Sequence, residues 1–234
     1  MNNVSFTPFF ETPIMEVQLD LDLEKLTEFT FEMWNNDKKG VKQTNFGGWQ
    51  SGGVIKEKHE EFIKLKKEIT QHLQTFHSNF FREMKYKENV TPAIVDAWLN
   101  INEKYHYNEW HHHPMSTLSG VFYIKHDCSA ENGDFVFKNP YSYATFHWPI
   151  GLVKDFNKIT SCFINYIPKP NMLLIFPAWL EHKVEMNLKN DSRISLSFDS
   201  TIIPLNQLEK KSYYEETFRQ YGKESESRKR TYEG

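Results

Sequence analysis

The stretch NMLLIFPAWLEHKVEMNLKNDSRISLSFD at residues 171–199 decides the expected fold. Its apolar run at 172–176 is typical of a buried strand, and the proline that follows predicts that this strand ends in a turn. His182 comes directly after the turn, and eleven positions later Arg193 opens the alternating run RISLSF. The stretch therefore predicts three short strands, at 172–176, 182–186 and 193–198, of which the second begins at His182 and the third at Arg193.

The last of these strands has a polar face and an apolar face. Since successive strand residues point to opposite sides, Arg193 and Ser195 share one face while Ile194 and Leu196 share the other. The planar guanidinium of arginine suits a carboxylate, and a neighbouring hydroxyl adds a further hydrogen bond. On the inner face of a barrel such a pair requires an anionic ligand, because a buried unpaired cation is costly. The structural alternative is a surface ion pair between Arg193 and Asp191.

The flanking sequence predicts more strands after a helical first third. An extended segment at 12–19 is followed by a helix over about 23–34, capped by Asp20 or Asp22, and by a long amphipathic helix over 57–84. Glycine-rich residues 45–53 are expected to form neither helix nor strand. The expected strands are at 93–101, 117–125, 134–137, 172–176, 182–186 and 193–198. This order indicates an antiparallel sandwich or jelly roll with helices packed outside.

Composition excludes several classes of protein. The 234 residues carry 28 basic and 31 acidic side chains, and this near-neutral balance argues against a dedicated binder of nucleic acid or of membrane surfaces. Two cysteines exclude a disulfide scaffold or a cysteine-rich zinc site. The sequence lacks a long apolar run and a charged, apolar leader, so we expect a protein of the reducing cytoplasm.

A second dense signal is NEWHHHP at residues 108–114. In an extended backbone His111 and His113 point to the same side and His112 points away. Two imidazoles on one face, joined by a third group from elsewhere in the chain, make half of a plausible transition-metal site. Alone, an H-x-H pair is more often structural than ligating.

Taken together, these signals have a characteristic order: H-x-H, about seventy residues, His, eleven residues, Arg-x-Ser. This order resembles that of bacterial and phage 2-oxoglutarate/Fe(II)-dependent oxygenases, which are distantly related to prolyl hydroxylases. The resembling stretches are FGGWQS (46–51), EWHHHPMSTLSGVFYI (109–124) and residues 171–199. The resemblance implies a mostly β fold with flanking helices around a double-stranded β-helix (jelly-roll, cupin-like) core. We expect one domain over 1–206, with helical support at 20–90, a core at 93–200 and a charged tail at 207–234.

The same resemblance implies roles for individual residues. His111 and His182 match two iron ligands of the family, and Arg193 with Ser195 matches its clamp on the distal carboxylate of 2-oxoglutarate. Tyr123 is a further candidate for binding the co-substrate. The residues themselves suggest candidates for contact with the substrate: Trp49 in the glycine-rich loop at 46–51, Trp148 in the aromatic segment at 138–166, and Asn102, which shares a strand face with Trp98.

The second metal ligand is where the chain departs from the family pattern. Most such oxygenases have Asp or Glu two positions after the first histidine, but here that position is His113. Three alternatives remain open at the level of sequence. His113 itself binds the metal, or Glu109 or Asp134 supplies a carboxylate, or two histidines and water suffice.

The implied cofactors are Fe(II) and 2-oxoglutarate, with dioxygen as co-substrate and ascorbate as a candidate reductant. The implied reaction hydroxylates a peptidyl or small-molecule substrate and releases succinate and carbon dioxide. One rival is a cupin-like three-histidine dioxygenase that does not use 2-oxoglutarate and has no need of Arg193. Another is a non-catalytic jelly-roll binding module whose histidines hold a closed structural zinc.

Overall fold

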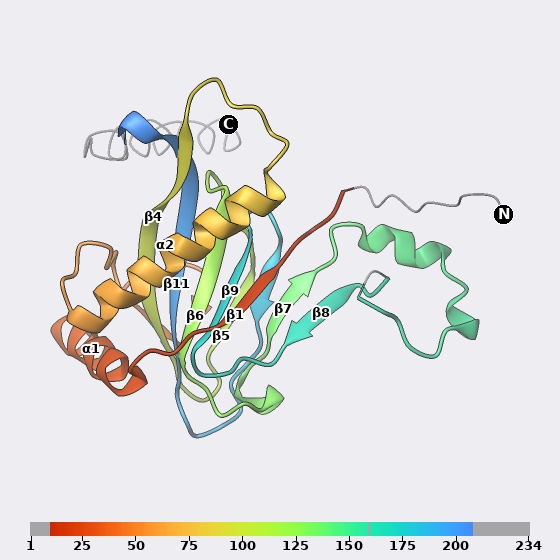
Figure 1. The fold of residues 1–234 in the computed structure, drawn as a ribbon. Helices are drawn as coiled ribbons and strands as arrows, with labels where there is room; N and C mark the ends of the chain where they lie inside the picture. Colours follow the sequence, from red (N-terminus) through yellow and green to blue (C-terminus); the bar gives the residue numbers. More distant parts are fainter. Residues whose placement is uncertain (1–9, 159, 208–234) are drawn as a thin grey trace, which may run out of the picture.

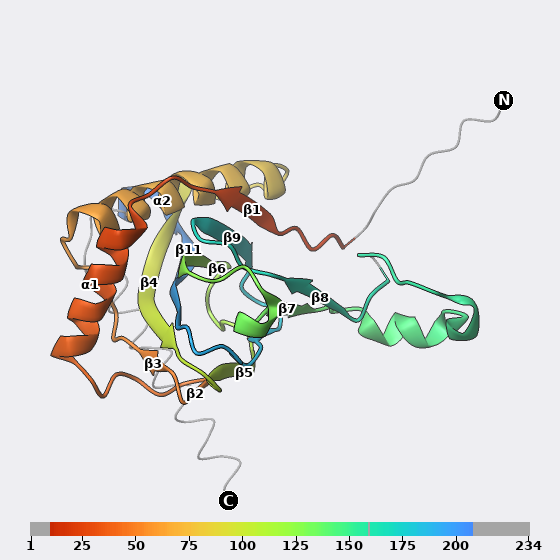
Figure 2. The same ribbon diagram turned by 90° about the horizontal axis from the view of Figure 1, so that it is seen from below.

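The computed structural model describes residues 10–158 and 160–207, and these form two antiparallel sheets with two helices outside the larger one (Figures 1 and 2). In spatial order, the six-stranded sheet consists of β1 (Met15–Gln18), β9 (Met172–Pro177), β6 (Leu118–Lys125), β11 (Arg193–Pro204), β4 (Val90–Asn102) and β3 (Trp49–Gln50). The five-stranded sheet consists of β2 (Asn45–Phe46), β5 (Tyr107–His111), β10 (His182–Val184), β7 (Phe135–Lys138) and β8 (Phe163–Tyr166). The expected β-rich fold with flanking helices is confirmed.

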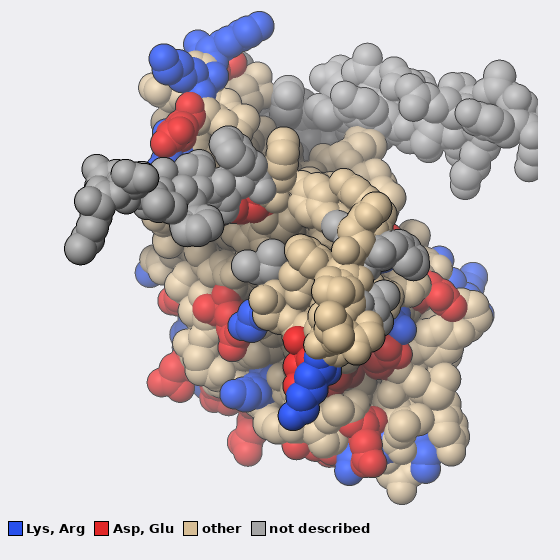
Figure 3. Space-filling model, turned by 90° about the vertical axis from the view of Figure 1, so that its right-hand side faces the viewer, with Lys and Arg blue, Asp and Glu red and all other residues tan. Residues whose placement is uncertain are grey.

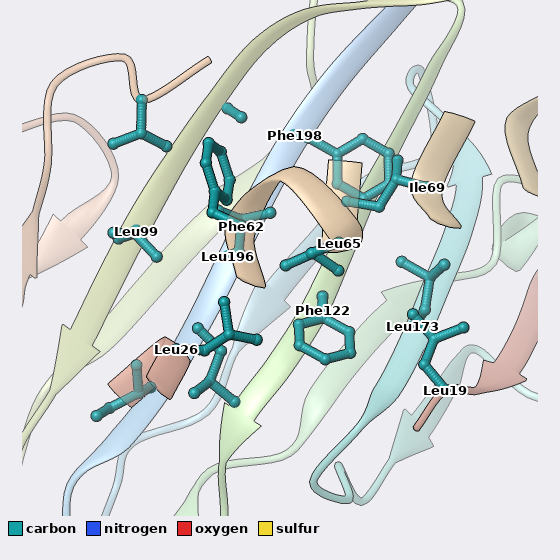
Figure 4. Close-up of a cluster of buried hydrophobic side chains, with 14 of the residues drawn as sticks. Leu19, Leu26, Phe62, Leu65, Ile69, Leu99, Phe122, Leu173, Leu196 and Phe198 are labelled. Carbon is teal, nitrogen blue, oxygen red and sulfur yellow. The ribbon is translucent and has the colours of Figure 1, made fainter. Parts of the chain in front are cut away.

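Alternation along the central strands separates two buried layers. On β11, Ile194, Leu196 and Phe198 face the helices, where they join the large apolar core shown in Figure 4. The residues between them turn toward the other sheet, where they line a cavity. The same alternation on β6 and β9 gives a second apolar cluster between the sheets. The inner space of the sandwich is thus apolar on one side and polar on the other.

The two helices cover the larger sheet because their apolar stripes match its outer face. Helix α1 (Leu23–Asn36) begins after Asp22, whose carboxylate accepts a hydrogen bond from the Lys25 N–H at 3.2 Å. Helix α2 (Glu60–Phe80) buries the apolar face that the sequence predicts for it. The buried members of that stripe are Phe62, Leu65, Ile69, Leu73 and Phe76. Helix α2 lies within the expected span 57–84 but is shorter at both ends.

Two expectations of secondary structure were wrong. Residues 45–53 contain β2 and β3, although their glycines argued against any strand. These two-residue strands exist through pairing with distant partners: Asn45 lies opposite Asn108, and Trp49 lies opposite Ile101. Strands β5 and β8 were also not foreseen. Of the expected tail at 207–234, all but its first residue lies outside the described residues.

The segment between β7 and β8 projects from the body as an arm in both ribbon views (Figures 1 and 2). It contains the short 3-10 helices η2 (Ser142–His147) and η3 (Ile150–Leu152). Figure 3 shows the face that carries this arm, where the described basic and acidic side chains are interspersed rather than gathered by sign. Across the described ranges, none of the helices has the length and apolar character that crossing a membrane requires.

Candidate active site

Three histidines converge at one end of the cavity between the sheets. His111 ends β5 and lies directly opposite His182 of β10, and His113 follows in a loop whose N–H donates to the Ala178 carbonyl at 2.9 Å. One ring nitrogen from each of the three lies within 4.8 Å of the other two. Their convergence agrees with the sequence prediction that His111 and His113 point to the same side.

In each of these rings the Nδ1 atom faces a hydrogen-bond acceptor of the protein. The Nδ1 atom of His111 is 2.7 Å from the Glu109 carbonyl oxygen, and that of His182 is 2.8 Å from the Leu180 carbonyl oxygen. Because a carbonyl only accepts, Nδ1 must be the donor in both rings and Nε2 must carry the lone pair. Nδ1 of His113 is 3.1 Å from Oδ1 and 3.2 Å from Oδ2 of Asp199.

The resulting Nε2 donors fit a shared metal ion. Nε2 of His113 is 3.3 Å from Nε2 of His182. With both protons at Nδ1 this contact is not a hydrogen bond, and two lone pairs facing each other call for a cation between them. Two nitrogens about 2.0–2.1 Å from one ion lie about 2.8–3.4 Å apart for angles between octahedral and tetrahedral, which includes the observed separation.

Burial keeps two of these rings neutral, as metal ligands must be. Burial lowers the pKa of His111 to about 4, and the neighbouring His113 adds to this. Burial also lowers the pKa of His182 well below its usual value, with further lowering by the other two histidines. The His182 ring is packed by phenylalanines of β7 and β9. At neutral pH these nitrogens are therefore available as electron-pair donors.

The carboxylate alternatives do not join this cluster. The Glu109 side chain is exposed, and this residue contributes only its main-chain carbonyl to the His111 ring. Asp134 does not line the cavity, and its Oδ2 accepts from the Asn165 amide at 3.1 Å. Neither residue belongs to the group of potential metal ligands that the described chain assembles.

The same cavity has a cationic end built on Arg193. Arg193 is 2% exposed, and its guanidinium donates to the Gly133 carbonyl at 3.1 Å. Gly133 has a φ of +97°, and a Cβ there would lie 2.6 Å from Nη1 of Arg193. The surface ion pair considered from the sequence is wrong, because Asp191 pairs with Lys125 at 2.7 Å. Among the described residues no carboxylate forms an ion pair with Arg193.

Two hydroxyl groups, those of Ser195 and Tyr123, line the same cavity as this arginine. Ser195 lies directly opposite Tyr123 across the β11–β6 pair, and both line the cavity. The Tyr123 side chain is fully buried, and within the described chain its hydroxyl has no hydrogen-bond partner. Burial raises the pKa of this hydroxyl, so it remains a donor. A buried cation next to an unpartnered O–H is an arrangement suited to a carboxylate ligand.

His126 is a residue near this end that the sequence did not single out. Its Nδ1 accepts from the Cys128 N–H at 3.0 Å, so the ring proton is at Nε2, which is buried. Burial, and secondly the charge of Arg193, lower its pKa to about 4. It follows a predicted strand, but nothing in the sequence indicates that its ring is buried.

Acid is expected to destabilise the metal-free protein through His126. Its folded pKa of about 4 lies below the ordinary value of 6.5, so the unfolded chain binds more protons between these values. Stability is therefore lost as the pH falls from about 6.5 to about 4, by at most about 1.4 kcal/mol per pH unit for one group. Urea unfolding at several pH values should show a flatter slope for His126→Gln. The exposed His147→Gln is the control, and equal slopes in both variants would contradict the expectation.

The candidate substrate residues fall in different places. Asn102 is buried and lines the cavity, next to Asn100 and Trp98 on the same face of β4. Trp49 does not line it, because its indole is packed in the apolar core and donates to the Asp37 carbonyl at 2.7 Å. Trp148 follows η2 on the projecting arm, is 43% exposed and does not line the cavity either.

Comparison with known proteins bears on this site. Residues 96–199 match the family described as "Putative 2OG-Fe(II) oxygenase". Residues 96–199 form a 2-oxoglutarate/Fe(II)-dependent oxygenase domain. This matched span contains all three converging histidines together with Arg193, Ser195 and Tyr123. The domain is accordingly that of an enzyme family whose cofactors are Fe(II) and 2-oxoglutarate.

Solved structures agree with the fold of this oxygenase domain. A prolyl-4-hydroxylase of Pseudomonas putida superposes with a TM-score of 0.53 at 11% identity, covering 80% of this chain and 92% of that one. HygX of Streptomyces hygroscopicus, with nickel and 2-oxoglutarate bound, gives 0.55 at 10% identity, covering 83% and 84%. A viral collagen prolyl hydroxylase of Paramecium bursaria Chlorella virus 1 gives 0.50 at 12%, covering 80% and 94%. No curated protein sequence matches the chain.

Proposed function

We propose that this protein is an Fe(II)- and 2-oxoglutarate-dependent dioxygenase that hydroxylates a polar substrate, with His111, His113 and His182 as the metal ligands. The observation that supports this most is the presence of two complementary sites in one cavity. Three ring nitrogens within 4.8 Å of one another lie at one end, and a buried arginine to which no described residue offers a carboxylate partner lies at the other. A chelating 2-oxoacid needs both.

The protein's own groups have separate tasks in this proposal. When bound, Fe(II) and 2-oxoglutarate together activate dioxygen, and the co-substrate leaves as succinate and carbon dioxide. Arg193 would bind the distal carboxylate, and Ser195 and Tyr123 would donate hydrogen bonds to it. The aromatic packing on the His182 ring shields that ligand from water. Three protein ligands leave positions for the co-substrate and dioxygen.

The polar lining supports a polar substrate. Amides of Asn100, Asn102 and Gln43 line the cavity beside the Trp98 ring, which stacks against His113 at a centroid distance of 5.8 Å. The cavity volume is about 280 Å³, which is near the lower end of the range for ligand sites. The co-substrate and the reacting part of the substrate would fill it, and the rest of the substrate would lie outside. Both a small polar molecule and a peptide side chain suit this geometry.

The proposal assigns the activity to a single domain that ends near residue 206. In this assignment the helices within 20–90 support the core, and the core within 93–200 carries every proposed ligand of iron and 2-oxoglutarate.

Anaerobic reconstitution tests the proposal directly. Adding 2-oxoglutarate to the Fe(II)-loaded protein should produce the visible charge-transfer band of an iron–2-oxoacid chelate, and adding succinate instead should not. Under oxygen, slow formation of succinate, sustained by ascorbate, is expected even without the substrate. A protein that binds Fe(II) but shows neither band nor succinate would overturn the proposal.

The two rivals give different outcomes in the same experiment. A three-histidine dioxygenase that does not use 2-oxoglutarate would bind Fe(II) without the band and would be indifferent to loss of Arg193. A module with a closed structural zinc would keep four protein ligands and show no exchangeable position. The buried arginine and the match to an oxygenase family favour the proposed function over both.

A further inference from the structure

His113 differs from the other two histidines of the cluster in the acceptor that its Nδ1 atom faces. The Nδ1 atoms of His111 and His182 face main-chain carbonyls, whereas Nδ1 of His113 faces both carboxylate oxygens of Asp199 at 3.1 and 3.2 Å. His113 occupies the position at which a two-histidine, one-carboxylate site has its carboxylate. The negative charge that is absent from that position is therefore present directly behind its replacement.

Strand pairing holds Asp199 in this place. It follows Arg193, Ser195 and Ser197 on the cavity face of β11, and it precedes an irregularity in the register at Ser200. The side chains of His113 and Asp199 are only 11% and 17% exposed, so little water competes for their contact. Asp199 also lies opposite Asp96 of β4, so no basic partner from that strand neutralises it.

We propose that Asp199 is a positioning residue for the metal centre that acts through His113, an inference that rests on the proposed function. A carboxylate that accepts the Nδ1–H fixes the ring tautomer, aims the Nε2 lone pair and makes that nitrogen a stronger donor. The His113–Asp199 pair thereby takes the place of the carboxylate ligand. It compensates for the charge that a third neutral imidazole does not supply.

Titration of the metal-free protein with Co(II) tests this without any turnover. Asp199→Asn keeps the shape of the side chain and removes its charge, and it is expected to weaken Co(II) binding about 10- to 100-fold. Asp96→Asn is the matched control, because it removes a charge that faces the same cavity from the opposite strand without contacting His113. Because Asp96 lies opposite Asp199 and repels it, removing the charge of Asp96 should leave the Co(II) affinity unchanged or slightly higher, and should not lower it. Equal losses in both variants would overturn the inference in favour of a general effect of charge.

A double-variant cycle shows whether Asp199 acts through His113. In a His113→Asp background the carboxylate is back in the ligand position, so Asp199→Asn should no longer weaken Co(II) binding, and relief of repulsion should strengthen it. The same loss in both backgrounds would overturn the inference.

A spectroscopic measurement covers the case in which His113→Asp does not fold. In the Co(II)-bound parent, proton NMR should show a shifted Nδ1–H resonance from each ligating histidine, and Asp199→Asn should displace or broaden that of His113 alone. An unchanged set of resonances would overturn the inference. A parent that binds no Co(II) would overturn the proposed function itself, whereas a parent and an Asp199→Asn variant that bind equally would overturn only this inference.

Discussion

Replacing His182 with alanine is expected to abolish Fe(II) binding. Its ring is 2% exposed and is opposed by His111 across β10–β5 and by Nε2 of His113 at 3.3 Å, so it is the central member of the cluster. Loss of outer partners of metal ligands already costs about 10- to 100-fold in affinity, so loss of a direct ligand should cost more than about 100-fold. Anaerobic titration with Fe(II), followed by competition with a chelator, measures the change.

Two further variants make that result interpretable. His182→Gln retains more of the bulk among the phenylalanines, so it separates loss of a ligand from loss of packing. His112→Ala removes the neighbouring exposed histidine and should leave Fe(II) affinity unchanged. Thermal unfolding of each metal-free variant shows whether it is folded. A folded His182→Gln protein with the Fe(II) affinity of the parent would contradict the assignment of His182 as a ligand.

Alternation made the cavity face of β11 predictable from sequence. In the run RISLSF alternate residues share one face of the strand, so Arg193 and Ser195 were expected on the same face. Continuing the alternation places Asp199 on that face as well. What sequence could not supply is which strand lies opposite. His182 meets His111 only because β10 pairs with β5, and β5 was not foreseen from a polar run of five residues.

Residues held by tertiary contacts were the ones that sequence reasoning missed or misplaced. Trp49 was expected near the substrate because glycines surround it, but those glycines allow two short strands whose pairing buries the indole. His126 and Asp199 acquire their roles from the groups they face, the Cys128 N–H and the His113 ring. The neighbouring residues in the sequence do not indicate such contacts, so they become visible only in the folded structure.

Replacing Arg193 with methionine is expected to separate co-substrate binding from stability. The guanidinium is buried and, within the described part of the chain, forms no ion pair, so an apolar side chain of similar length should leave the metal-free protein at least as stable. Binding of 2-oxoglutarate should nevertheless weaken on the order of 100-fold or more, because the distal carboxylate loses its charged partner. Fe(II) affinity should stay near that of the parent, since Arg193 is not among the clustered ligands.

The control for this variant is Lys125→Met, which removes a basic residue one register position away on the neighbouring strand. Lys125 is 40% exposed and pairs with Asp191 outside the cavity, so its loss should change neither 2-oxoglutarate binding nor the charge-transfer band. Titrating the Fe(II)-loaded proteins anaerobically with 2-oxoglutarate, alongside thermal unfolding of the metal-free forms, measures both quantities. If Arg193→Met lowered stability strongly and left 2-oxoglutarate affinity intact, the arginine would serve the Gly133 carbonyl and the fold. A stable protein with lost co-substrate affinity would instead mean that the cation is retained for an anionic ligand, at a cost in desolvation that only binding offsets.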